Sequence, residues 1–70
     1  MSLVLYEAEG RIAVITLNRP ESRNAMSPEL SAALGEAFDR FDADDDLWVA
    51  ILAGNGRVFC AGADLKALSE

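Results

Sequence analysis

The stretch at residues 11–17 constrains the fold more than any other part of the chain. It is rich in β-branched residues, and both of its alternating sets of side chains are largely apolar. A strand of this kind has cover on both of its faces, as in a sheet that lies between other layers. A similar run at residues 3–7 precedes it, and Gly10 can supply the positive φ of a short hairpin loop. We therefore expect these two runs to pair as an antiparallel hairpin, with its loop at residues 8–10.

An amphipathic helix is predicted after a polar break at residues 18–24. Ser27 is a favourable N-cap, Pro28 suits the first helical position, and Glu29 suits the positive end of the helix dipole. Apolar residues then recur at the spacing of a single helix face, namely Leu30, Ala33, Leu34, Ala37, Phe38 and Phe41. The acidic run at residues 42–46 lacks the glycine and glutamate positions of an EF-hand calcium loop. We interpret it as a solvated turn that ends the helix.

A third apolar run, at residues 48–53, follows the helix and predicts a buried strand in a βαβ arrangement, with a parallel component in the sheet. A second helical start is predicted at residues 63–68. The fold class is therefore α/β. A chain of 70 residues buries only about 60% of its unfolded surface. Because it has one cysteine and no histidine, it can be stabilised neither by an internal disulfide nor by a metal site with Cys and His ligands. We expect residues 1–70 to be one small domain or part of one, cut off where a second helix begins.

Charge and residue types exclude several classes of function. The net charge of −6 opposes nucleic-acid binding, and the longest apolar run is far shorter than the roughly 18 residues of a membrane span. We expect a cytoplasmic protein with neither nucleic acid nor membrane as a partner, since no targeting segment opens the chain. Because histidine is absent, this chain by itself cannot form a Ser-His-Asp triad or a His-ligated zinc site. No metal site is predicted.

Residues 59–65 carry small side chains directly into the predicted second helix. Free N–H groups at such a helix start, with the positive end of the dipole behind them, can bind a carbonyl oxygen that becomes an oxyanion. The main-chain N–H of Ala63 is the candidate donor, and an ordinary strand-to-helix corner is the alternative. The spacing of Gly54, Gly56 and Gly62 fits neither a dinucleotide-binding motif nor a P-loop.

Four segments, taken together and in this order, resemble the N-terminal part of the enoyl-CoA hydratase/isomerase family, the crotonases. They are residues 17–20 (Leu-Asn-Arg-Pro), 24–26 (Asn-Ala-Met), 49–54 and 59–65. The resemblance covers essentially residues 3–70, and it implies that residues 1–70 are the truncated N-terminal fragment of a single crotonase-like domain. It implies a crotonase-like spiral of strand-strand-helix repeats that assembles as a homotrimer or a dimer of trimers. It also implies that the substrate is an acyl-coenzyme A thioester.

The resemblance further implies which residues form the site. Members of the family stabilise a thioester enolate with two main-chain N–H groups, and one of these positions matches Ala63. A preorganised donor of this kind binds the thioester oxygen more strongly as negative charge develops on it. The implied substrate-binding residues are Arg23, Ala25, Ala61, Ala63, Asp64, Leu65 and Lys66. Arg23 or Lys66 would pair with the phosphates of coenzyme A, with surface solvation as the alternative for both, and helix capping is the alternative for Asp64.

Enoyl-CoA hydratase, a lyase that adds water across the 2,3 double bond, is the leading function because hydratases are abundant in the family. No cofactor is expected beyond the coenzyme A that the substrate carries. The alternatives are an enoyl-CoA isomerase, another acyl-CoA lyase or hydrolase of the family, or a non-catalytic acyl-CoA or partner-binding module if the chain ends at residue 70. In the family, the second donor and the acid/base carboxylates lie in later segments. We therefore expect these 70 residues alone to be inactive.

Overall fold

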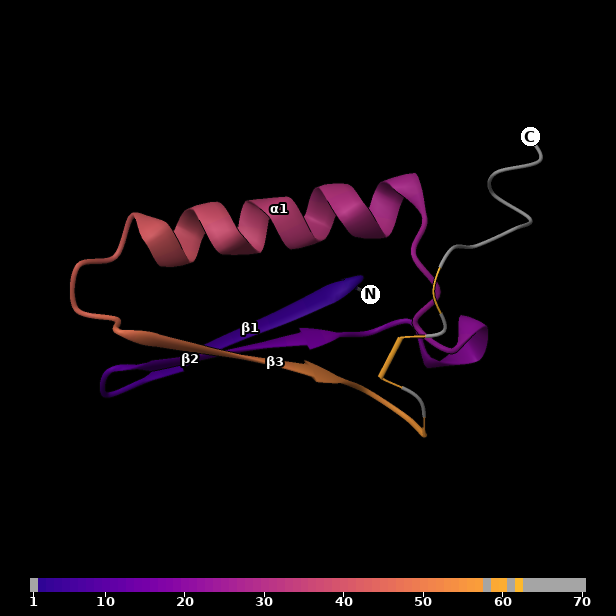
Figure 1. The fold of residues 1–70 in the computed structure, drawn as a ribbon, viewed down its shortest axis with the longest axis horizontal. Helices are drawn as coiled ribbons and strands as arrows, with labels where there is room; N and C mark the ends of the chain where they lie inside the picture. Colours follow the sequence, from indigo (N-terminus) through magenta and orange to yellow (C-terminus); the bar gives the residue numbers. More distant parts are fainter. Residues whose placement is uncertain (1, 58, 61, 63–70) are drawn as a thin grey trace.

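The computed structural model describes residues 2–57, 59, 60 and 62, so the helical start predicted at residues 63–68 lies outside the described residues. The elements in chain order are β1 (Val4–Glu9), β2 (Ile12–Leu17), the 3₁₀ helix η1 (Pro20–Ser22), α1 (Pro28–Asp42) and β3 (Val49–Gly54). They form two layers (Figure 1). A three-stranded sheet in the order β1-β2-β3 makes one layer, and α1 lies along one face of it.

The sheet contains both the antiparallel hairpin and the parallel pair that the sequence predicts. β1 pairs antiparallel with β2, and β2 pairs in parallel with β3, beginning where Ile12 lies opposite Val49. The hairpin loop is shorter than the predicted residues 8–10, because Glu9 still pairs with Ile12. Gly10 occupies the first of the two remaining loop positions with φ +60°, as in a type II′ turn, whose twist matches that of the strands.

Helix α1 begins where predicted, and Ser27 caps it by accepting a hydrogen bond from the Leu30 N–H at 3.2 Å. The helix packs mainly against β1 and β2. The buried apolar core is made of Ala13, Ile15, Leu17, Leu30, Ala37 and Leu47. Phe38, which the helical pattern placed on the buried face, is instead 40% exposed. No helix among the described residues is long and apolar enough to cross a bilayer.

Strand β3 departs most from the sequence prediction. The run at residues 48–53 was expected to be buried on both faces, yet Ile51 and Leu52 are 48% and 40% exposed. The reason is its place in the sheet, since β3 forms an edge and α1 covers β1 and β2 instead. Because α1 lies along one face of the sheet, the other face of β2 is also uncovered, and Ile12 on that face is 42% exposed. The prediction of cover on both faces of residues 11–17 is therefore wrong in this structure.

Candidate functional site

Two loops meet beyond the carboxyl ends of the parallel strands β2 and β3 (Figure 1). The first loop, residues 18–26, follows β2. The second loop follows β3, and its described residues are 55–57, 59, 60 and 62. In open α/β sheets, ligands bind outside this edge, because the strand ends present the loops side by side. The fold therefore brings residues 17–20 and 24–26, the first two segments of the family resemblance, beside the loop that follows Gly54.

The first loop is closed by its own hydrogen bonds. Arg23 and Asn24 have φ of +56° and +54°, a left-handed conformation that asparagine tolerates better than most residues. The Arg23 N–H donates to the Pro20 carbonyl at 3.0 Å, and the Asn24 N–H donates to the Arg19 carbonyl at 2.9 Å. The Arg19 guanidinium donates through Nη1 to the Ala25 carbonyl at 3.1 Å. These bonds hold the loop in a compact turn.

The side chain of Asn24 joins the two loops. It is fully buried, its Oδ1 accepts the Arg19 N–H at 2.8 Å, and its Nδ2 donates to the Asn55 carbonyl at 2.9 Å. A buried polar group left without a partner costs about 1–3 kcal/mol, so both ends of this amide matter for stability. A more exposed link runs beside it, in which Asn55 Nδ2 donates to Asn18 Oδ1 at 2.7 Å.

The main chains of the two loops also meet directly. The Met26 N–H donates a hydrogen bond to the Gly62 carbonyl. Gly54 permits the second loop to fold back on itself, because a Cβ there would lie 2.6 Å from the carbonyl oxygen of Phe59 and 2.7 Å from its Cα. A Cβ in a folded protein is essentially never found within 3.0 Å of such atoms, so glycine is the residue that fits this position without a shift of the backbone. The glycine at the end of β3 therefore sets the path of the loop toward residue 62.

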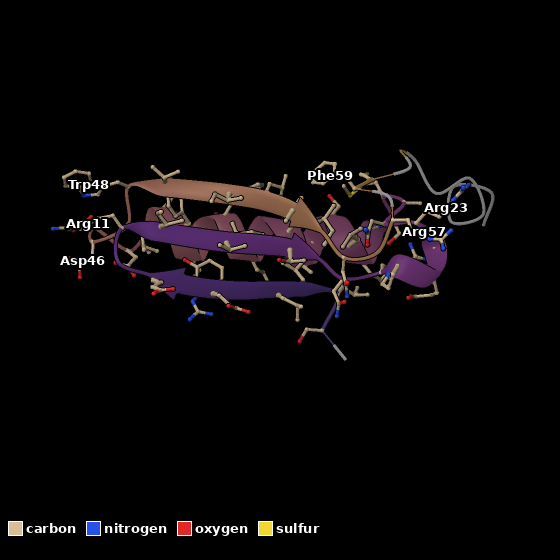
Figure 2. The ribbon with its side chains drawn as sticks, turned by 90° about the horizontal axis from the view of Figure 1, so that it is seen from below. Arg11, Arg23, Asp46, Trp48, Arg57 and Phe59 are labelled. Atoms are coloured by element: carbon tan, nitrogen blue, oxygen red, sulfur yellow. The ribbon has the colours of Figure 1, made fainter. Side chains whose placement is uncertain are left out.

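An open hollow of about 320 Å³ lies between the two loops. It is lined by Pro20, Arg23, Asn55, Gly56 and Arg57. Figure 2 shows Arg23 and Arg57 at the same end of the molecule. Both charged side chains in this lining are guanidinium groups, although the chain as a whole carries a net charge of −6. Two arginines beside one hollow suit a phosphate group, because the planar guanidinium matches the geometry of phosphate oxygens.

The structure places two of the sequence-predicted site residues at this junction. Arg23 is exposed and Ala25 is partly buried in the first loop. The others lie outside the described residues, namely Ala61, Ala63, Asp64, Leu65 and Lys66. Sequence reasoning missed Arg57, although a cation just beyond the carboxyl end of a predicted parallel strand was a usable signal. It also missed Asn24, whose partner Asn55 is 31 positions away.

The remaining candidates form no site among the described residues. Cys60 is a partly buried free thiol. No group of three or more His, Cys, Asp or Glu side chains in the described part of the chain is arranged to hold a metal ion. The acidic run after α1 is exposed, and Asp44 Oδ1 accepts the Asp46 N–H at 3.0 Å. Arg11, 3.9 Å from the Asp46 carboxylate, lies with it at the opposite end of the molecule from Arg57 (Figure 2).

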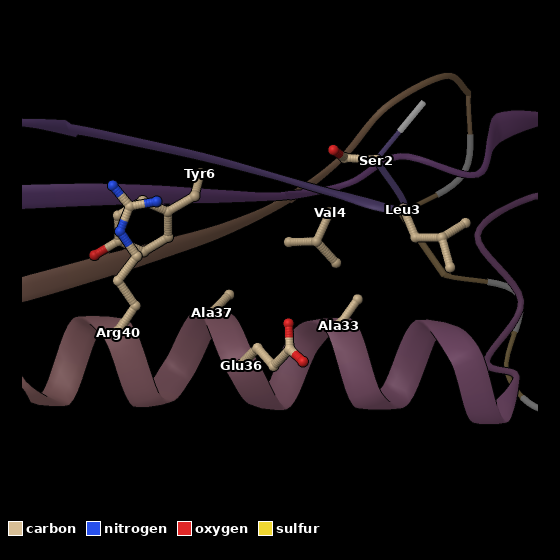
Figure 3. A pocket seen from close by; sticks show the side chains of 8 residues that line it. All are labelled: Ser2, Leu3, Val4, Tyr6, Ala33, Glu36, Ala37 and Arg40. Carbon is tan, nitrogen blue, oxygen red and sulfur yellow. The ribbon is translucent and has the colours of Figure 1, made fainter.

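A separate hollow of about 390 Å³ opens between β1 and α1 (Figure 3). The Arg40 guanidinium carbon lies 4.2 Å from the centre of the Tyr6 ring, and the two side chains meet there across the layers. The Tyr6 hydroxyl is buried and has no hydrogen-bond partner within the described residues. Neither Arg23 nor Ala25, the two predicted site residues that the structure describes, lines this hollow.

Comparison with known proteins agrees with the family resemblance. The family model described as enoyl-CoA hydratase/isomerase matches residues 7–70. An enoyl-CoA hydratase from Mycobacterium tuberculosis is 46% identical over 66 residues, which are 94% of this chain and 25% of that protein. The (E)-benzylidenesuccinyl-CoA hydratase of Thauera aromatica is 44% identical over 64 residues, 90% of this chain and 25% of the relative.

Solved structures show the same relationship in three dimensions. The crystal structure of a probable enoyl-CoA hydratase/isomerase from Mycobacterium abscessus matches with a TM-score of 0.94 at 46% identity, covering 99% of this chain and 27% of that one. The chain thus spans about a quarter of the length of these relatives. The α/β class and the crotonase-like order of strand, strand and helix are confirmed. The chain belongs to the enoyl-CoA hydratase/isomerase family.

Proposed function

We propose that the protein carrying this chain is an enoyl-CoA hydratase, which adds water across the 2,3 double bond of an acyl-coenzyme A thioester. Family membership and the hydratase names of its relatives support this reaction. The observation that carries the proposal is the junction of the two loops at the carboxyl ends of β2 and β3. There a cationic hollow lies beside the backbone that leads into Gly62.

The hollow is the proposed site for the phosphates of coenzyme A. Arg23 and Arg57 flank it and would pair with phosphate oxygens through charge-assisted hydrogen bonds. No cofactor is proposed beyond the coenzyme A moiety of the substrate. The proposed further contacts to the substrate come from Ala25, Ala61, Asp64, Leu65 and Lys66. All of these follow from the family resemblance, and Ala25 lies in the first loop.

The main-chain N–H of Ala63 is proposed to bind the thioester oxygen. Water loses one proton to a base as its oxygen bonds to C3, and the electron pair of the double bond moves toward the thioester and leaves an enolate oxygen. A proton then bonds to C2 and the thioester carbonyl is restored, so the net change is the addition of one water molecule. A donor already aimed at that oxygen stabilises the enolate by roughly 2.7–4 kcal/mol. The acid/base groups and the second donor are proposed to lie in segments beyond these 70 residues.

The test replaces the donor itself in the intact protein. Ala63→Pro removes the N–H, whereas Ala63→Gly keeps it and serves as the matched control. Loss of the conjugated double bond is followed by its ultraviolet absorbance under steady-state conditions. We expect the proline variant to lose at least ~100-fold in kcat/KM and the glycine variant to stay within about tenfold of the native protein. Equal turnover by the two variants would refute the assigned role.

The same assay separates the competing reaction that the family description includes. An isomerase would shift the double bond of a 3-enoyl thioester and would leave a 2-enoyl thioester unhydrated.

We also propose that the chain forms the N-terminal part of a larger domain, in a cytoplasmic enzyme assembled as a trimer or a dimer of trimers. The exposed apolar side chains of β3, including Ile51 and Leu52, support further packing against other segments. Sedimentation of the intact protein measures the assembly state.

A further inference from the structure

Asn24 occupies a position from which it can control the spacing of the two loops. Its side chain is 0% exposed, and both ends of its amide are used, one on Arg19 within the first loop and one on the Asn55 carbonyl of the second. Its own backbone is left-handed, at φ +54°. The residue is thus fixed in conformation and bonded to both loops at once, which makes it a brace between them.

The segment that Asn24 holds ends at the Met26 N–H, which donates to the Gly62 carbonyl. A carbonyl and the N–H that follows it belong to one planar unit, and in the trans form they point in opposite directions. A hydrogen bond that fixes the Gly62 carbonyl therefore also restricts the direction of the N–H joined to the same carbonyl carbon. Donation to the carbonyl polarises the unit as well, which strengthens that N–H as a donor.

We propose that Asn24 is a positioning residue for the enolate-binding N–H. By holding the first loop at a fixed distance from Asn55, it keeps the Met26 N–H on the Gly62 carbonyl and thereby aims the following N–H at the thioester oxygen. This inference rests on the proposed function for its catalytic consequence. This relay, which runs along the chain from Asn24 to Met26 and then through the hydrogen bond from the Met26 N–H to the Gly62 carbonyl, is a property of the fold and can be tested by itself.

The chain offers a matched pair of variants for the intact protein. Asn24→Gly removes the side-chain bonds to Arg19 and Asn55 and retains a residue that accepts the left-handed backbone, so strain does not confound the result. Asn18→Ala removes the more exposed link to Asn55 Nδ2 and leaves the bonds from Asn24 to Arg19 and Asn55 in place. Asn24→Asp keeps the acceptor for the Arg19 N–H and loses the donor to the Asn55 carbonyl.

The first measurement follows hydrogen exchange of the Met26 amide. We expect exchange to be at least ~10-fold faster in Asn24→Gly than in the native protein, with Asn24→Asp between them and Asn18→Ala close to native. This readout does not depend on which reaction the protein performs. Native protection of the Met26 amide in Asn24→Gly would overturn the relay.

The second measurement compares two ligands of the folded protein. Free coenzyme A reports the nucleotide site, and a coenzyme A thioester analogue with a fixed negative charge at the thioester oxygen reports the aimed N–H. We expect Asn24→Gly to bind the charged analogue at least ~10-fold more weakly while its affinity for coenzyme A changes less than about twofold, and kcat to fall by roughly 10- to 100-fold.

The outcomes distinguish the two proposals. A parallel loss of affinity for both ligands, or a native kcat per folded binding site, would show that Asn24 has only a structural role. If Asn24→Gly does not fold, Asn24→Asp gives the same comparison, and its binding and kcat support or overturn the positioning role in the same way. A native protein that binds neither ligand would refute the proposed function, and the exchange measurement would still decide whether Asn24 controls the Gly62 contact.

Discussion

Replacing Gly54 by alanine tests whether the end of β3 sets the path of the second loop. The added Cβ would lie 2.6 Å from the carbonyl oxygen of Phe59 and 2.7 Å from its Cα. Because ordinary carbon contacts lie near 3.5–4.0 Å, the backbone at Phe59 would have to move by about 1 Å. Overpacking of this kind costs about 1–3 kcal/mol. A displacement of about 1 Å near the reacting atoms can lower the rate about 100-fold.

The assay measures the free energy of unfolding in urea and kcat/KM for the same preparations of the intact protein. Gly54→Ala should lose about 1–3 kcal/mol of stability and at least ~10-fold in kcat/KM. Gly35→Ala in α1 is the matched control, since nothing lies within 4 Å of its added Cβ. It should gain about 0.5–1 kcal/mol from helix propensity and keep its activity. A Gly54→Ala protein with native stability and native kcat/KM would refute the proposed role of this glycine.

Contacts elsewhere in the chain give three further predictions. Ser27→Ala removes the cap that accepts the Leu30 N–H and should cost about 0.5–2 kcal/mol in urea unfolding, and unchanged stability would contradict the capping role. Replacing both Arg23 and Arg57 by alanine should raise KM for a coenzyme A ester by at least ~10-fold but leave a pantetheine thioester unaffected; an equal change for both substrates would exclude phosphate binding. Arg11→Ala removes a guanidinium that lies 4.8 Å from the exposed Trp48 ring and donates to the Asp46 carbonyl, and because these contacts are exposed it should cost no more than about 1 kcal/mol in the same urea assay; a larger loss would contradict the assignment of these contacts as weak surface interactions.

The local elements were predictable because their signals lie within a few residues of one another. Ser27 and Pro28 at the helix start and the apolar spacing after them specify α1, and its observed cap is the one the sequence predicts. The β-branched run that became β2 and the glycine of the hairpin loop specify the antiparallel pair. An apolar run following a helix specified the parallel partner β3.

Burial was harder to predict because it depends on what lies across from each face. The apolar side chains of Ile51 and Leu52 carry the pattern of a covered strand, yet α1 packs on β1 and β2 and leaves these two side chains exposed. Residue patterns describe the surroundings that a strand is suited to. They do not show whether other elements of the chain cover that strand.

The residues of the candidate site also differ in how far the sequence alone could identify them. Arg23 and Ala25 were found through the family resemblance, whereas the brace formed by Asn24 depends on a carbonyl 31 positions later. An acceptor on the main chain leaves no mark in the sequence, because every residue has the same carbonyl group. Arg57 became a candidate only when the fold placed it beside Arg23.

The proposed chemistry depends on where an acyl-coenzyme A thioester lies against the two joined loops. A crystal structure of the intact protein with an unreactive enoyl-coenzyme A analogue would locate it. We predict the thioester oxygen at about 2.7–3.1 Å from the main-chain nitrogen of Ala63, with the nucleotide phosphates against Arg23 and Arg57. A thioester oxygen bound elsewhere, or an Ala63 N–H already bonded to a peptide carbonyl, would contradict the proposed mode of binding.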